Sequence, residues 1–461
     1  MAVDSVTGSS SAGKPVTDAA GQPWPNPRYA WYVAAVLMLA YAFAFVDRIV
    51  LSVLVPAIKA DLGLTETQIG LLGGFAFAVT YTVLGLPVGR MADRANRRNI
   101  ILAGTTLWSL ATAACGLATN FWHLFWARVM VGVGEATLQP SATSLVSDYF
   151  PPETRSRAIG LFVMGTSLGT GAAFLLVGLM LQLISGIKAE GGLEAWKAWE
   201  LVFILVGLPG LIVSVLLFTV REPVRRERMK AQAGAVPGAG VPISEFVAFM
   251  KGHWMTYTAV IVGVMLVFLA VYGQLLFMPA FFVRVHQWTP QQIGTSFGIV
   301  ALTCGVLSAL SSGWIASWLA KSGRDDATIW ICLLGAVGTC LPAAIAPLMP
   351  TGGWALAMFA ISGLFANWPS VGALSAIGQV TPNEMRAQAT AVYTFVVGLL
   401  SSGAGPLVVG LLTDRLFGDP MAVGKSISLT FAVCGVGATL LLLAGVGPFK
   451  TTARQAKALR A

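Results

Sequence analysis

The chain contains 461 residues, of which 56% are hydrophobic and only 11% are charged. Soluble domains carry about 25% charged residues, so this composition, with a mean hydropathy of +0.76, excludes an ordinary soluble protein and indicates an integral membrane protein. The net charge of +9 does not indicate nucleic-acid binding, because most positive residues lie in the short segments between apolar runs.

Residues 1–28 are rich in Ser, Gly and Pro. They lack the apolar stretch of a signal peptide and are predicted to form a disordered cytoplasmic tail. Apolar runs of roughly 20 residues, each long enough to cross a bilayer as a helix, then recur along the chain. The twelve predicted spans are 31–57, 67–88, 99–118, 121–149, 157–186, 200–219, 256–283, 291–319, 328–348, 353–380, 387–416 and 425–448. We therefore expect an all-α integral membrane fold with twelve transmembrane helices.

The longest polar segment after the tail separates six spans from six. The two halves repeat weakly, since GTGAAFLLVG (169–178) aligns with SSGAGPLVVG (401–410). Such internal repeats are typical of secondary transporters. The predicted parts are a first bundle (29–220), a cytoplasmic linker (221–255), a second bundle (256–448) and a cytoplasmic tail (449–461).

Lys and Arg are concentrated in alternate connecting segments. The positive-inside rule then predicts that both termini are cytoplasmic. Within the linker, residues 243–253 have two interpretations: a short amphipathic helix on the inner membrane surface, or a helical start to the seventh span.

Four charged residues interrupt the first and fourth spans, namely Asp47, Arg48, Arg128 and Glu135. A charge at the bilayer centre costs about 2.5–3.5 kcal/mol on insertion scales, so these charges indicate a functional site. At about 1.5 Å of rise per residue, the Asp47–Arg48 pair is level with the interval between Arg128 and Glu135. The competing interpretation is a set of static ion pairs that hold the helices together.

Asp47 and Glu135 are the only acids predicted at this depth, so they are the candidates for proton coupling. Arg48 and Arg128 are candidate partners for an anionic head group, because arginine stays charged and binds phosphate or carboxylate in a bidentate way. Arg128 is also a candidate static partner of the acids. No cofactor is expected besides the coupling proton, since the Cys and His residues show no metal-ligand spacing.

Several motifs resemble those of known transporters. The segment GRMADRANRR (89–98) resembles the signature loop of the major facilitator superfamily, with Asn96 where many members have Gly. The segments VDR (46–48), RVMVGVGEA (128–136) and RSR (155–157) resemble the spinster family of that superfamily. This resemblance implies two pseudo-symmetric six-helix bundles, alternating access, and coupling through Asp47, Arg48 and Glu135.

The resemblance also implies a cytoplasmic gate at Gly89, Asp93, Arg94 and Arg97. In the superfamily, the Asp of this loop holds the first bundle to the start of the eleventh helix, whose N-terminal dipole attracts it. That start lies near Arg386 here. The competing interpretation is positive charge that only sets the membrane orientation.

The spans of the second half carry no charge near mid-depth. Arg284, Asp414 and Arg415 are expected near outer ends, with side chains extended to the membrane surface. The candidates for cavity lining are Tyr272, Asn367 and Trp368. A cavity charged on one side and apolar on the other fits an amphipathic anion. The spinster resemblance implies lysophospholipids or sphingolipid phosphates.

Two alternatives to such a transporter stay open: a proton-coupled transporter of small organic anions or drug-like compounds, and a non-transporting membrane sensor. A membrane enzyme ranks last, because the spans contain no HExxH motif and no Ser–His pair at plausible depth. The expected partners are a small amphipathic substrate and the lipid bilayer, without nucleic acid. The expected form is a monomer in the bacterial inner (cytoplasmic) membrane.

Overall fold

The computed structural model describes residues 23–92, 94–190, 192, 195–225, 242–321 and 324–458. The first half contains α1 (Pro27–Leu62), α2 (Glu66–Gly70), η1 (Leu71–Phe75), α3 (Ala76–Ala92), α4 (Arg97–Cys115), α5 (Phe121–Glu135), α6 (Leu138–Tyr149), α7 (Pro152–Ala189) and α8 (Ala198–Leu217). The second half contains α9 (Ile243–Gly252), α10 (Trp254–His286), α11 (Pro290–Lys321), α12 (Ala327–Ile345), η2 (Ala346–Leu348), α13 (Gly352–Phe365), α14 (Trp368–Val380), α15 (Asn383–Val396), η3 (Val397–Ser401), α16 (Ser402–Leu411), η4 (Leu412–Phe417), η5 (Pro420–Ala422) and α17 (Val423–Ala458).

The predicted all-α fold with twelve passes is confirmed. Within the described residues, ten helices are long and apolar enough to cross a membrane. The other two passes are α4, which begins with Arg97 and Arg98, and the pair α5 and α6, which is interrupted at Ala136 and Thr137. This interruption makes Glu135 the last residue of α5.

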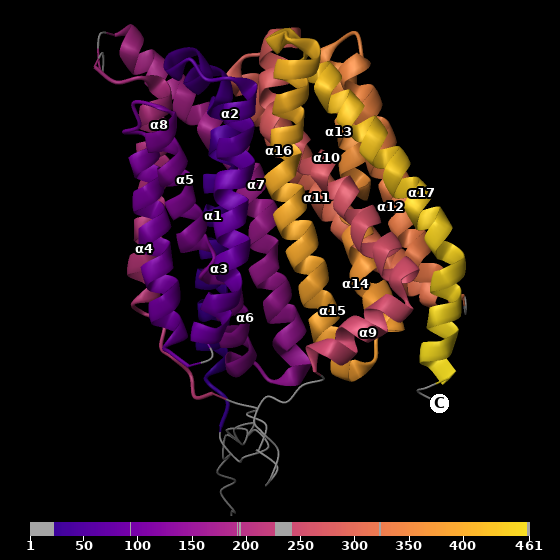
Figure 1. Ribbon diagram of the computed structural model, residues 1–461. Helices are drawn as coiled ribbons and strands as arrows, with labels where there is room; N and C mark the ends of the chain where they lie inside the picture. The colour runs from indigo at the N-terminus through magenta and orange to yellow at the C-terminus, as the bar shows by residue number, and fades with distance from the viewer. Residues whose placement is uncertain are drawn as a thin grey trace, which may run out of the picture.

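Successive passes alternate in direction, and α1 begins at the end of the molecule where α17 finishes (Figure 1). We call this the terminal end. The opposite end, which contains the end of α1, the start of α2 and η4, is the distal end. Helices α1–α8 form one bundle and α10–α17 form the other (Figure 1).

Helix α9 is separate from the seventh pass. It ends at Gly252, and the chain turns at His253 (φ −119°, ψ 29°) before α10 begins. At the C-terminus of the second half, α17 continues past the predicted end of the last span at residue 448 and ends at Ala458. Arg454 in this extension donates to Asp325 at 3.3 Å, so the helical extension is held against the loop before α12.

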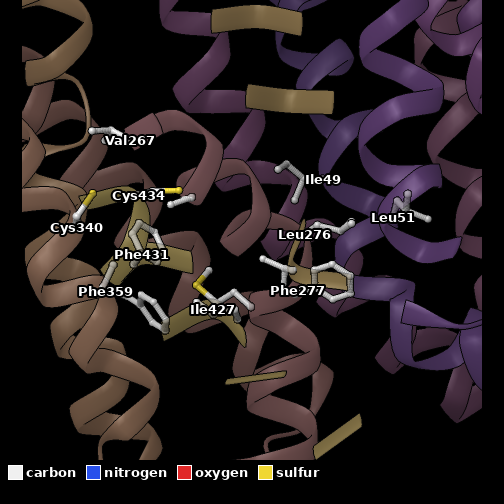
Figure 2. Packing of buried hydrophobic residues seen from close by; sticks show 14 of the residues in the cluster. Ile49, Leu51, Val267, Leu276, Phe277, Cys340, Phe359, Ile427, Phe431 and Cys434 are labelled. Carbon is white, nitrogen blue, oxygen red and sulfur yellow. The ribbon is translucent and has the colours of Figure 1, made fainter. Parts of the chain in front are cut away.

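An apolar core joins the two bundles through α1 and α10. Ile49 and Leu51 of α1 belong to the same buried apolar cluster as Leu276 and Phe277 of α10, and Ile49 lies close to Leu276 (Figure 2). All four side chains are at most 5% exposed. Because lipid tails are as apolar as leucine, close packing rather than exclusion of water stabilises such contacts in a membrane.

Glycines bring α4 and α5 together next to Glu135. A Cβ atom added to Gly134 would lie 2.7 Å from the main-chain oxygen of Gly104 and 2.8 Å from Cβ of Trp108. Only glycine allows this approach. The crossing therefore fixes the last turn of α5 and, with it, the position of Glu135.

Gly134→Ala should lower the melting temperature of the purified protein by several degrees, because overpacking costs about 1–3 kcal/mol. Gly160→Ala in α7 is the matched control, since an added Cβ there meets no atom within 4 Å. It should maintain or raise the melting temperature, because Ala is a better helix former than Gly by about 1 kcal/mol. Equal melting temperatures for the two variants would contradict the close α4–α5 crossing.

Candidate functional site

The first bundle contains a buried ion pair between Arg48 of α1 and Glu135 of α5. Nε and Nη2 of Arg48 lie 2.7 and 2.6 Å from Oε2 of Glu135. The Glu135 side chain is fully buried, whereas that of Arg48 is 19% exposed. Oε1 of Glu135 is buried and makes no hydrogen bond to the described residues. The Glu135 carboxylate is therefore enclosed by protein, whereas the Arg48 guanidinium is partly exposed.

Three aromatic rings surround the Arg48 guanidinium. Its central carbon lies 4.7, 4.6 and 4.7 Å from the ring centroids of Phe45, Phe77 and Tyr81. Cation–π contacts of this kind contribute about 0.5–2 kcal/mol each. The Tyr81 hydroxyl donates to Gln139 at 2.9 Å, which orients its ring. The charge of Arg48 is therefore fixed in position by apolar faces.

Arg128 contacts the main chain of α1 rather than a carboxylate. Its Nη1 donates to the main-chain oxygen of Asp47 at 3.0 Å, and the residue is only 1% exposed. Its Nε is buried and makes no hydrogen bond to the described residues. Arg128 therefore holds α5 against α1, and its Nε–H group is available to donate a further hydrogen bond.

Asp47 lies on the α4 side of α1. It is 3% exposed, and its carboxyl group interacts with Glu135 and Arg128 as well as with Thr112 of α4. Consecutive residues in an α-helix point about 100° apart, so the two adjacent charges cannot share one face. The four charges are thus close together but do not form one closed network. They comprise one ion pair, one contact to the main chain, and one carboxyl group facing α4.

A cavity of about 110 Å³ lies between the bundles beside this ion pair. Its lining comes from α1, η1, α3, α5, α10, η3 and α16, and among the described residues its charged lining groups are Arg48 and Arg128. The hydroxyl-bearing residues of the lining are Ser52, Tyr81, Tyr272 and Ser402. Most other lining side chains are apolar or aromatic. Tyr272, a candidate for cavity lining, lies in the wall of this cavity.

Asn367 and Trp368 do not line this cavity. The main-chain nitrogen of Asn367 donates to the Ser308 hydroxyl at 3.0 Å. The Trp368 indole nitrogen donates to the Ser311 hydroxyl, also at 3.0 Å. Both residues therefore join the start of α14 to α11 within the second bundle.

The four predicted gate residues have different surroundings. Gly89 lies in α3, and a Cβ atom added to it would lie 4.0 Å from the Cβ atom of Pro140. Arg94 is exposed, and Asp93 lies outside the described residues.

Arg97 is 1% exposed and is bound by one acid of its own bundle and by one at the start of the linker. It donates to Asp148 at 2.5 Å and to Glu222 at 2.7 Å. Sequence reasoning missed both acids, because they lie 51 and 125 residues away along the chain.

The expectation that Arg284 and Asp414 extend to the membrane surface is wrong. Nη1 of Arg284 donates to Glu66 at 2.6 Å. The Asp414 carboxylate accepts hydrogen bonds from the first turn of α2. Both residues therefore contact the first bundle at the distal end, whereas Arg415 is exposed.

A twelve-pass helical protein with two bundles around a charged cavity has the architecture of a membrane transporter. Residues 37–406 match the model of the Major Facilitator Superfamily, and the chain belongs to this family. It is therefore a multi-pass integral membrane protein of a transporter family, not an enzyme.

Three comparisons refine this assignment. The chain is 29% identical over 415 residues to an MFS-type efflux pump of Mycolicibacterium smegmatis, covering 88% of this chain and 90% of that protein. It is 26% identical over 451 residues to a D-galactonate transporter of Escherichia coli, covering 91% and 96%. A bacterial homologue of the human lysosomal transporter spinster, solved in an inward-facing and unoccupied conformation, superposes with a TM-score of 0.76 at 25% identity. That match covers 93% of this chain and 98% of the other. The resemblance to the spinster family is thus confirmed.

Arg97→Gln should strongly destabilise the protein, because breaking a buried ion pair costs about 3–5 kcal/mol. Arg94→Gln is the control, since an exposed substitution usually changes stability by less than about 0.5 kcal/mol. Thermal unfolding of the purified variants measures both. If Arg97→Gln has the same melting temperature as Arg94→Gln, the Arg97–Asp148–Glu222 cluster does not stabilise the first bundle.

Proposed function

We propose that this protein is a proton-coupled secondary transporter that moves an amphipathic anion, such as a lysophospholipid or a sphingolipid phosphate, by alternating access. The observation that carries the proposal is the Arg48–Glu135 ion pair at the wall of the cavity. One partner is a fixed cation that a ligand can reach. The other is a buried acid that can bind a proton.

The Glu135 carboxylate and the substrate anion compete for Arg48, so proton binding to Glu135 favours anion binding. While Glu135 is ionised, it neutralises the Arg48 guanidinium through two close nitrogen–oxygen contacts. Protonation of Glu135 removes that negative charge and leaves a buried cation, which is costly without a counter-ion. An anionic head group then supplies the missing charge. In this mechanism a proton and an anion are bound in the same state of the transporter.

Asp47 is a second candidate for proton binding, as the spinster resemblance implies. Its carboxyl group faces α4 rather than the cavity, so it would respond to movement between α1 and α4. Arg128 lines the cavity and has an unbonded Nε. Its role in the proposal is to hold α1 in place and to add positive potential to the head-group position.

The rest of the cavity suits an acyl tail. Ile49, Leu275, Leu276 and Pro406 give apolar wall on both sides of the bundle interface. A lipid-like substrate is also what the resemblance of the sequence motifs to the spinster family implies. The proposed location is the bacterial inner membrane with both termini cytoplasmic, where the positively charged segments of the terminal end satisfy the positive-inside rule.

A small organic anion is the second candidate substrate, because the E. coli relative is a D-galactonate transporter. A polyhydroxylated acid needs many hydrogen-bond partners, since buried polar groups left unpaired cost about 1–3 kcal/mol each. The cavity lining offers only four hydroxyl-bearing side chains beside its two arginines. This composition favours an apolar tail over a sugar chain.

Glu135→Gln should abolish the dependence of transport on a pH gradient, because the amide keeps the side-chain shape but cannot release a proton. Proton flux and substrate uptake in proteoliposomes measure this. Glu190→Gln is the control, since Glu190 is exposed at the end of α7. Transport by Glu135→Gln with an unchanged pH dependence would contradict the coupling role of Glu135.

Lysophosphatidylglycerol should bind to the wild-type protein and be transported, whereas D-galactonate should do neither at the same concentration. Arg48→Gln should weaken lysolipid binding by roughly 10- to 100-fold, because a hydrogen bond to a charged group contributes about 1.5–3 kcal/mol. Ligand-induced melting shifts measure binding, and proteoliposome uptake measures transport. Uptake of D-galactonate but not the lysolipid would favour the second candidate, and binding without any flux would favour a sensor.

A further inference from the structure

The distal end is held closed by a carboxylate of one bundle and a helix start of the other. Oδ1 of Asp414 in η4 accepts from the main-chain nitrogen of Glu66 at 3.2 Å. Oδ2 accepts from the main-chain nitrogen of Thr67 at 2.7 Å and from its hydroxyl at 2.6 Å. The first amides of a helix have no partner within the helix and carry partial positive charge. Asp414 supplies the missing acceptor across the bundle interface.

A second contact lies beside it. The Glu66 side chain is 0% exposed, and its Oε1 accepts from Arg284 of α10 at 2.6 Å and also from Lys59 of α1. Arg284 in turn donates to the main-chain oxygen of Pro420 at 3.1 Å. Glu66 therefore joins a cation of its own bundle to a cation of the opposite bundle. We call Lys59, Glu66, Thr67, Arg284 and Asp414 the distal latch.

The helices below the distal latch meet through glycines. A Cβ added to Gly70 would lie 2.6 Å from the main-chain oxygen of Pro406, and one added to Gly410 would lie 2.4 Å from that of Glu66. Backbones this close have few interdigitating side chains between them. These crossings place the first turn of α2 within hydrogen-bond reach of η4, and the charged contacts of the distal latch supply the directional bonds there.

We propose that Asp414 is a gating residue, which holds α2 against η4 while the distal end is closed and must release it before substrate can pass that end. The proposal rests on transport by alternating access but not on the identity of the substrate or on proton coupling. A contact made in only one conformation biases the equilibrium toward that conformation. Loss of the carboxylate therefore favours the distal-open state.

The test is the dwell time of the distal-closed state in single-molecule fluorescence energy transfer. Dyes are attached through Leu117→Cys and Gly353→Cys in a background without the native cysteines. Leu117 is 61% exposed, and a Cβ at Gly353 meets no atom within 4 Å. Asp414→Asn should shorten the closed dwell time on the order of tenfold, because hydrogen bonds to charged groups contribute at least this factor to an equilibrium.

Asp419→Asn is the matched control. It removes a carboxylate at the same end that, among the described residues, accepts only from Met421 within its own bundle, and should leave the dwell time unchanged. Thr67→Ala removes one of the three bonds to Asp414 and should give a smaller shortening, which provides a second reading if Asp414→Asn fails to fold. The proposal is overturned if Asp414→Asn or Thr67→Ala gives the same dwell time as Asp419→Asn. Because no substrate or pH gradient is used, this result is independent of the role of Glu135.

Discussion

The ion pair between Arg48 and Glu135 is the interaction on which the rest of the site depends. Charges inside a membrane protein are tolerated only when they are paired or bonded to polar groups. The first bundle supplies this through several contacts that fix the pair in place. They are the glycine crossing at Gly134, the aromatic rings around Arg48 and the bond from Arg128 to the α1 main chain. An acid buried beside a reachable cation is the element that can link a proton to an anion.

Much of this arrangement could be predicted from the sequence, since charges within apolar runs are conspicuous. The twelve passes and the depth of Arg48 and Glu135 follow from helix length and rise alone. The side of α1 on which Asp47 lies could not be predicted from the sequence, because tertiary packing decides which helix each face of α1 contacts. Periodicity could have shown that Asp47 and Arg48 point about 100° apart around α1.

Other errors came from long-range contacts that no local pattern contains. Arg284 and Asp414 were assigned to the membrane surface because they lie near helix ends. Their partners in α2 are 218 and 347 residues away in sequence. Asn367 and Trp368 were candidates for cavity lining because Pro369 was expected to kink the helix and expose main-chain carbonyls; they join α14 to α11 and do not line the cavity beside Arg48. The resemblance implies a comparable contact of Asp93 at the terminal end, and that residue lies outside the described residues.

The most direct test of the competition at Arg48 is the number of protons taken up when an anionic lysolipid binds to the detergent-solubilised protein. If the head group displaces Glu135 from Arg48 and Glu135 is then protonated, binding should take up close to one proton by linkage. A pH indicator in weakly buffered solution measures this uptake. We expect uptake by the wild-type protein and almost none by Glu135→Gln. Tight lysolipid binding without proton uptake by the wild-type protein would contradict the mechanism.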